Sequence, residues 1–186
     1  TAVLGLAFQE RLHAEVLDMD RRTALSGWFY STVAGFAALM QFAGAPLILR
    51  WASPAAVLLA VPAVHVLAAG ALLAWTTLPV ATGALMLFKV LDYSLFRVTK
   101  EMLYIPLSFE ARYRAKETID AFGYRFSGGF MSAVAFILQR ASGAGVGLYG
   151  LMAAALSTLW LAMTASWALQ GAGRAAATKA ALPPEE

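Results

Sequence analysis

Cysteine is missing from all 186 residues of the sequence. Its absence excludes disulfide bonds, thiolate metal sites and cysteine nucleophiles. Charge is also scarce, because Asp, Glu, Lys and Arg together make up 13% of the chain and the formal net charge is only +3. Hydrophobic residues make up 60% of the chain, and the mean hydropathy is +0.67. A chain with so little charge and so much apolar surface is suited to a lipid bilayer rather than to water.

Several patterns that carry chemistry are missing as well. No cluster of Lys and Arg with interleaved aromatic residues occurs, so we expect no nucleic-acid partner. His13 and His65 are isolated, with no carboxylate at ligand spacing, so we expect no metal ion and no cofactor. Ser127-Gly128-Gly129 lacks the following Lys and Ser or Thr of a phosphate-binding loop. Since no nucleophile with a neighbouring base stands out, an enzyme is the weakest functional interpretation.

Long apolar segments follow one another and predict an all-α integral membrane helix bundle. A helix rises about 1.5 Å per residue, so about 20 apolar residues cross a hydrocarbon layer ~30 Å thick. We expect five complete spans, at about residues 24–49, 54–75, 78–105, 116–138 and 148–169. Residues 1–16 are expected to form the last part of a helix that begins upstream, because the chain starts with Thr1 and shows no signal-peptide pattern. This gives a transmembrane domain over residues 1–170 and a disordered tail over residues 171–186.

Capping residues and prolines indicate where these helices begin and end. Thr23 or Ser26 can cap the helix expected at 24–49, because a side-chain oxygen accepts a free N–H of the first turn. Ser53 and Thr77 each stand just before a proline, which is typical of a helix start. Pro106 lacks a backbone donor and is expected to end the helix at 78–105.

Small residues predict where helices approach each other closely. Gly128 and Ser132 lie one turn apart in the stretch SGGFMSA. Small side chains at this spacing let the backbones of membrane helices come together. We therefore expect a close helix–helix contact at these two residues.

A charged face interrupts the apolar helix expected at residues 78–105. At 100° per residue, its basic and tyrosine residues share an arc of about 80°. They are Lys89, Tyr93, Arg97, Lys100 and Tyr104. Asp92 and Glu101 flank this arc, and the opposite face is apolar. Because an ionisable side chain at mid-membrane costs about 2.5–3.5 kcal/mol on insertion scales, the face predicts a wet cavity that binds an anion.

The same charges also have a structural interpretation, which the sequence leaves open. Lys89 and Asp92 are three residues apart, and Arg97 and Glu101 are four apart, so each pair can neutralise itself on a helix. Charges on the following helix can also pair with them. The candidate substrate-binding residues are Lys89, Asp92, Tyr93, Arg97, Lys100, Glu101, Asp120 and Arg125.

The distribution of Lys and Arg between the helix ends predicts the orientation. One end of the bundle is expected to carry Arg50, Arg112, Arg114, Lys116, Arg174 and Lys179. The other end is expected to carry Arg11, Arg21, Arg22 and Arg140, diluted by nearby Asp and Glu. Because cytoplasmic loops are enriched in Lys and Arg, we expect the first end to be cytoplasmic.

The stretch EMLYIPLSFEARYRAKETID, from Glu101 to Asp120, together with the following Arg125, resembles a signature of the ATP/ADP translocase family. These nucleotide transporters of intracellular bacteria and plastids, with many bacterial relatives, are built on the major-facilitator plan. The resemblance implies a major-facilitator-like six-helix C-terminal half, with the N-terminal half of the same protein upstream and a bacterial inner (plasma) membrane as its location. It also implies a nucleotide or other anionic small molecule as substrate, moved by alternating access.

The chain departs from the resemblance just after the signature. Nucleotide-exchanging members continue after the Arg with Gly-Lys-Ser-Gly-Gly, whereas this chain reads Phe126-Ser127-Gly128-Gly129. The resemblance therefore implies the fold and the class of substrate, and leaves ATP/ADP exchange itself open. The alternative function is a non-transporting membrane module that anchors or regulates an attached soluble domain. A matching six-helix repeat upstream favours transport over that alternative.

Overall fold

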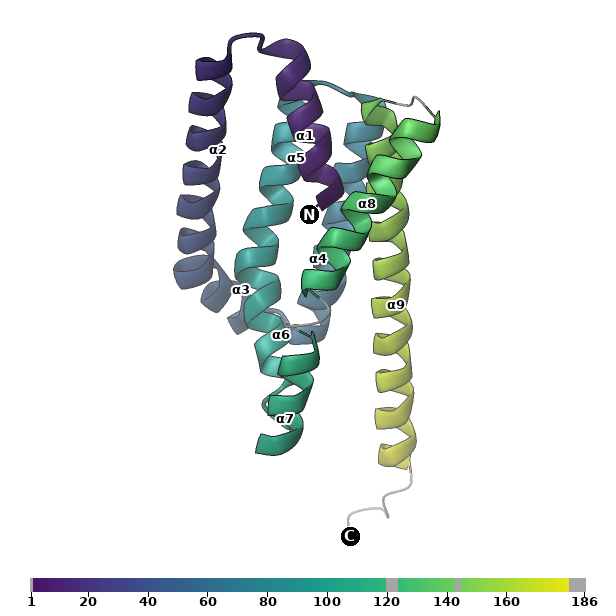
Figure 1. The fold of residues 1–186 in the computed structure, drawn as a ribbon. Coiled ribbons are helices and arrows are strands. Elements are labelled where there is room, and N and C mark those ends of the chain that lie inside the picture. Colours follow the sequence, from purple (N-terminus) through teal and green to yellow (C-terminus); the bar gives the residue numbers. More distant parts are fainter. Residues whose placement is uncertain (1, 120–123, 143–144, 181–186) are drawn as a thin grey trace.

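The computed structural model describes residues 2–119, 124–142 and 145–180, and the regular secondary structure of this part of the chain is entirely helical. In chain order the elements are α1 (Ala2–Glu15), α2 (Met19–Leu39), η1 (Met40–Gly44), α3 (Ala45–Trp51), α4 (Pro54–Ala74), α5 (Leu78–Leu91), η2 (Asp92–Phe96), α6 (Arg97–Leu103), α7 (Phe109–Lys116), α8 (Tyr124–Ser142) and α9 (Val146–Ala180). Figure 1 shows the long helices running side by side, with the short α7 beyond the end of α6. The prediction of an all-α bundle is confirmed.

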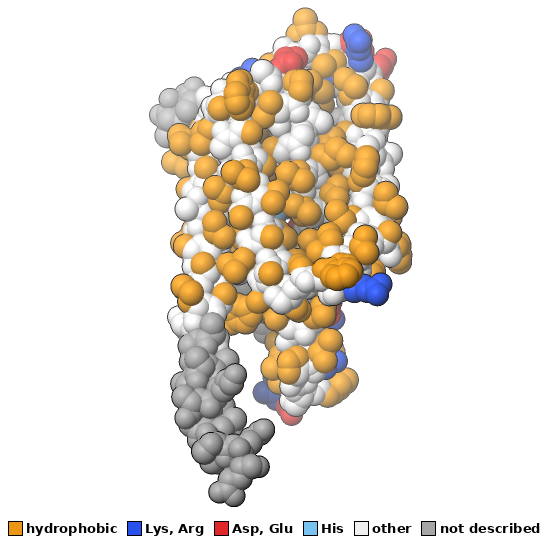
Figure 2. Space-filling model, turned by 180° about the vertical axis from the view of Figure 1, so that it is seen from behind, with side chains coloured by type: hydrophobic (Ala, Val, Ile, Leu, Met, Phe, Trp, Pro, Cys, Tyr) orange, Lys and Arg blue, Asp and Glu red, His pale blue; other side chains and the backbone are white. Residues whose placement is uncertain are grey.

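Four helical stretches in the described part of the chain are long and apolar enough to cross a membrane. They are Met19–Trp51, Pro54–Ala74, Leu78–Leu103 and Val146–Gly171. On the face drawn in Figure 2, charged side chains gather toward the two ends, and hydrophobic side chains cover the band between them. The protein is therefore an integral membrane protein.

The segment expected as a fifth complete span, residues 116–138, is only partly described. Residues 120–123 lie outside the described part, and α8 begins at Tyr124 after them. Within the described residues, α8 is not among the four long apolar helices, because polar residues lie at both of its ends, from Arg125 to Gln139.

The second helix starts earlier than expected, because a different residue caps it. An oxygen of the Asp18 carboxylate accepts the backbone N–H of Arg21 at 2.7 Å. The helix consequently begins at Met19. Thr23, one of the two expected caps, lies inside it and donates to the carbonyl of Met19 at 3.0 Å, and Ser26 is also inside. The negative charge of an aspartate at the cap also interacts favourably with the positive N-terminal end of the helix dipole.

The two proline-preceded helix starts are capped in different ways. Ser53 Oγ accepts the N–H of Ala56 at 3.2 Å, which confirms the expected cap of α4. Thr77 occupies the cap position of α5 without a side-chain hydrogen bond. The N–H of Leu78 instead donates to Glu15 Oε1 at 3.1 Å, so the end of α1 caps the start of α5.

The sequence predicted the end of α6 correctly, but it did not predict the end of α9. The span that starts at Leu78 ends at Leu103, just before the turn that contains Pro106, as expected. The last helix was expected to stop at about residue 169 and give way to disorder, whereas α9 continues to Ala180. Its last turns are rich in alanine, which has the strongest helix propensity of all residues. Residues 181–186 lie outside the described part.

The main core lies where α1 is enclosed by its neighbours. Leu12 of α1, Leu72 of α4 and Leu85 of α5 are almost completely buried in one cluster, with further residues from α2, α8 and α9. A second, smaller cluster joins Ala45, Val57, Val61 and Leu95 near the two π-helical segments. α1 therefore ties α5, α8 and α9 together and fixes the helix that carries the charged face.

The close glycine contact between two helices lies elsewhere than predicted. A Cβ atom built at Gly150 of α9 would lie 3.0 Å from Leu73 Cδ2, so α9 and α4 approach closely there. A Cβ atom at Gly128 would meet no atom within 4 Å, and Ser132 is exposed. The predicted close contact at Gly128 and Ser132 is therefore wrong for the described chain, and Gly128 lies beside an open space instead.

Candidate functional site

The charged part of the Leu78–Leu103 span contains a π-helical turn. η2 covers Asp92 to Phe96 and separates α5 from α6 within one continuous helix. A π turn closes hydrogen bonds between residues five apart, so the 100° spacing of an α-helix does not hold across it. The single arc expected for Lys89, Tyr93, Arg97 and Lys100 therefore divides into parts.

Lys89 and Tyr93 lie together on the side of the helix that faces α2. Lys89 Nζ donates to the hydroxyl of Tyr93 at 3.1 Å. The same ammonium group lies 5.5 Å from the ring centroid of Tyr30 on α2 and 5.2 Å from that of Tyr93. Both distances suit cation–π attraction. Lys89 is thus held by two aromatic rings, and no ion pair joins it to Asp92 in the described part.

The pair expected between Arg97 and Glu101 is replaced by another. Glu101 Oε2 forms an ion pair with Lys116 Nζ of α7 at 2.7 Å, and both side chains are 42% exposed. Arg97 is exposed and forms no ion pair with Glu101 in the described residues. Lys100 is half-buried and engaged in an interaction of its own. Arg97 is therefore the most accessible positive charge of the predicted face.

The two candidates on the following segment cannot be placed as a pair. Asp120 lies outside the described residues. Arg125 belongs to the first turn of α8, and its side chain is likewise outside the description. Their participation in substrate binding stays a prediction.

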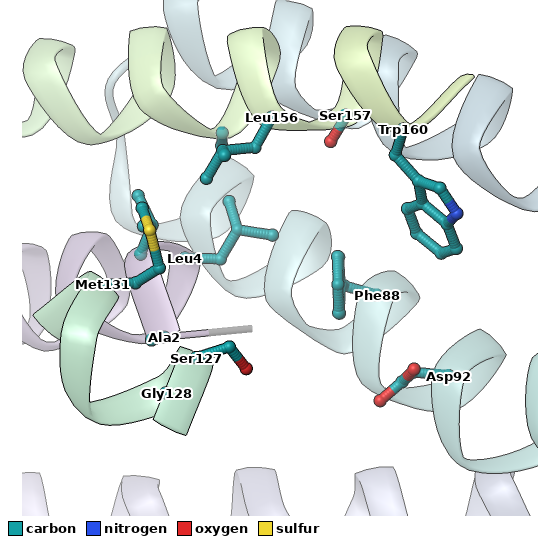
Figure 3. A pocket seen from close by; sticks show the side chains of 12 residues that line it. Ala2, Leu4, Phe88, Asp92, Ser127, Gly128, Met131, Leu156, Ser157 and Trp160 are labelled. Atoms are coloured by element: carbon teal, nitrogen blue, oxygen red, sulfur yellow. The ribbon is translucent and has the colours of Figure 1, made fainter. Parts of the chain in front are cut away.

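A cavity of about 300 Å³ adjoins the other side of the same helix (Figure 3). Its walls come from α1, α5 with η2, α8 and α9, and consist of Ala2, Val3, Leu4, Phe88, Asp92, Ser127, Gly128, Met131, Ala153, Leu156, Ser157 and Trp160. Asp92 is the one predicted substrate-binding residue on this list. The structure therefore separates Asp92 from Lys89, Tyr93 and Arg97, although the sequence placed them on one face.

Sequence reasoning missed the aromatic and hydroxyl residues of this cavity. Phe88 lies one turn before Asp92, and Ser157 and Trp160 are three residues apart on α9. Helical spacing puts Ser157 and Trp160 on one face of α9. A serine on the same face as a tryptophan in an apolar helix is the signal that was available.

Comparisons with known proteins agree with this arrangement of apolar helices and embedded charges. The family model described as TLC ATP/ADP transporter matches residues 32–171. ADP,ATP carrier protein 3 from Rickettsia felis, Rickettsia typhi and Rickettsia prowazekii is 44% identical over 55 residues, which are 28% of this chain and 11% of each carrier. The matched segment thus spans a small part of the length of these relatives. No solved structure matches the chain. Because the family match covers more than half of its residues, the chain belongs to the TLC ATP/ADP transporter family.

Proposed function

We propose that this chain forms part of a transporter that moves an anionic, nucleotide-like substrate across a bacterial inner membrane by alternating access. The relatives that share the 55-residue segment are named ADP,ATP carriers. In this proposal the charged span Leu78–Leu103 lines the substrate path. A second set of helices, from an N-terminal half of the same protein, forms the opposite wall in a major-facilitator-like arrangement.

The observation that carries the proposal is the charge on the Leu78–Leu103 span. This 26-residue stretch is apolar enough to cross the membrane and yet contains basic residues along its second half. Ionisable residues within a span usually face a water-filled path and mark the route of an ion or substrate. Arg97 supports this most directly, because Glu101 binds Lys116 instead and leaves the Arg97 guanidinium exposed.

A charge-conserving substitution tests the role of Arg97. The planar guanidinium of Arg binds a phosphate through two parallel hydrogen bonds, which the ammonium of Lys cannot reproduce. We expect Arg97→Lys to raise the KM for nucleotide uptake about tenfold, equivalent to ~1.4 kcal/mol. The measurement is uptake of labelled ATP and ADP into proteoliposomes that contain the full-length protein.

Arg114→Lys provides the matched control, because Arg114 lies on α7 outside the span and binds Glu110 at 2.5 Å. It is expected to transport as the wild type does. Equal uptake by Arg97→Lys and the wild type would remove Arg97 from the path. A wild-type protein that transports neither nucleotide would favour the non-transporting module that anchors or regulates a soluble domain.

A further inference from the structure

The cavity beside Asp92 contains a hydroxyl group that no other part of the described chain uses. Ser157 is 7% exposed and lines the cavity, and Figure 3 shows its oxygen directed toward the cavity from α9. Other hydroxyl side chains in the spans donate to the carbonyl four residues earlier, as Ser94, Thr99 and Thr164 do. Ser157 makes no such bond in the described structure. The Ser157 hydroxyl, which borders the cavity, is therefore available to a ligand or a water molecule there.

One wall of the cavity is aromatic, and its rings stack on a buried side chain behind them. His65 stacks on Phe88 with ring centroids 4.1 Å apart and an angle of 30° between the rings. The same imidazole stacks on Trp160 at 5.5 Å and 21°. Since His65 is 2% exposed, it fixes both rings without entering the cavity lining. Phe88 therefore offers an aromatic surface to whatever fills the cavity.

The polar groups of the cavity suit a ligand that has N–H donors on a flat ring. Asp92 contributes carboxylate oxygens, and Ser127 and Ser157 contribute hydroxyls that can donate or accept. Asp92 and Ser127 already take part in other interactions, but a carboxylate offers about four acceptor positions. A phosphate group would be repelled by Asp92, and the apolar majority of the lining would not solvate it. An aromatic base with an amino group satisfies both the flat wall and the acceptors.

We propose that this cavity binds the nucleobase of the transported nucleotide. The base stacks on Phe88, its amino group donates to Asp92, and Ser157 hydrogen-bonds to a ring nitrogen. This inference rests on the proposed transport function and adds the subsite that recognises the base. About 300 Å³ lies at the lower end of ligand pockets, which span roughly 300–1,000 Å³, so the cavity suits a base rather than a whole nucleotide.

Filling the cavity tests the proposal without removing any contact. A side chain at Gly128 would extend into the cavity, because a Cβ atom there meets nothing within 4 Å. Gly129, the next residue, is exposed and equally free of neighbours, so Gly129→Leu is the matched control. The experiment is isothermal titration of the full-length protein with two probes, ATP and inorganic tripolyphosphate, which has the phosphates but no base.

We expect Gly128→Leu to weaken ATP binding about tenfold or more, the loss that accompanies one base stack, and to leave tripolyphosphate binding unchanged. Gly129→Leu should bind both probes as the wild type does. Ser157→Ala, which keeps the backbone and nearly the same volume, should weaken ATP binding about threefold to tenfold and leave tripolyphosphate binding unchanged.

Three results would overturn the proposal. The first is that Gly128→Leu and Ser157→Ala each bind ATP as tightly as the wild type does, and the second is that they weaken the binding of ATP and tripolyphosphate equally. The third is that the wild type binds tripolyphosphate as tightly as ATP, which would show that the base contributes nothing while leaving the transport function standing. A wild-type protein that binds neither probe would refute the proposed function itself, and the base site with it.

Discussion

Arg112 shows how a charge at the edge of a span serves structure. Its Nε donates to the carbonyl of Tyr104 at 3.0 Å, and one of its terminal nitrogens donates to the carbonyl of Ile105 at 2.9 Å. These carbonyls follow the last turn of α6, where no later helical N–H can reach them. The sequence suggested an ordinary cytoplasmic positive charge at this position. In the structure it also fastens α7 to the end of the charged span.

We expect Arg112→Ala to lower the stability of the detergent-solubilised protein by about 1–2 kcal/mol, because two charge-assisted hydrogen bonds are lost from a half-buried side chain. The measurement is the melting temperature, followed by the loss of the folded species on size-exclusion chromatography. Arg114→Ala is the control, since Arg114 is 77% exposed and its pair with Glu110 is solvated. Equal melting temperatures for both variants would contradict the capping role.

At the scale of elements, two π-helical turns lie next to each other. η1 in the Met19–Trp51 span packs against η2 in the Leu78–Leu103 span. Leu95 of η2 is buried against Ala45, the first residue after η1. π turns of this kind are frequent at functional sites because they shift the register of the side chains that follow. Here Asp92, the first residue of η2, lines the cavity, while Lys89 lies beside Tyr30 of α2.

The contact between α4 and α9 depends on a glycine. We expect Gly150→Leu to destabilise the bundle by about 2–3 kcal/mol, because its side chain would overlap Leu73 on α4 and force the two helices apart. The yield of folded protein and its melting temperature in detergent are the measurements.

Gly70→Leu in α4 is the matched control, since a Cβ atom there meets nothing within 4 Å. It should fold in wild-type yield. If both leucine variants fold equally well, the close approach at Gly150 does not limit packing.

At the scale of the whole molecule, the arrangement of the helices groups the charges as expected. In Figure 1 the connections α1–α2 and α4–α5 lie at one end, and α3–α4 and α6–α7 lie at the other. Arg50, Arg112, Arg114 and Lys116 are therefore at one end, with Arg21 and Arg22 at the opposite end. From the positive-inside rule we expect the first end to face the cytoplasm.

The lack of cysteine allows this orientation to be measured directly. Phe109 and Leu17 are 85% and 88% exposed and lie at opposite ends of the bundle. In full-length protein whose other cysteines are replaced, we expect Leu17→Cys to react with a membrane-impermeant maleimide in intact cells. Phe109→Cys should react only after the membrane is permeabilised. The reverse pattern would invert the proposed topology.

The sequence alone determined the all-α class, the membrane as solvent and most helix starts. These depend on composition, on apolar segment length and on local signals such as Ser53 before Pro54, which act within a few residues. The cap of α2 by Asp18 is an equally local contact. Nearby Ser, Thr and Asp residues are also suited to a cap position, so the sequence did not single out Asp18 as the cap. The family signature, too, is a continuous stretch and could be recognised without coordinates.

Only the tertiary structure decided how the polar residues are partnered. Glu101 pairs with Lys116 rather than Arg97, because the turn after α6 brings α7 back against the span. The cavity likewise combines Asp92 and Ser157, which are far apart in sequence, and Gly128 borders it instead of packing against a helix. Helical periodicity cannot register such contacts, because they depend on where neighbouring helices cross and on a π turn that shifts the side chains after it.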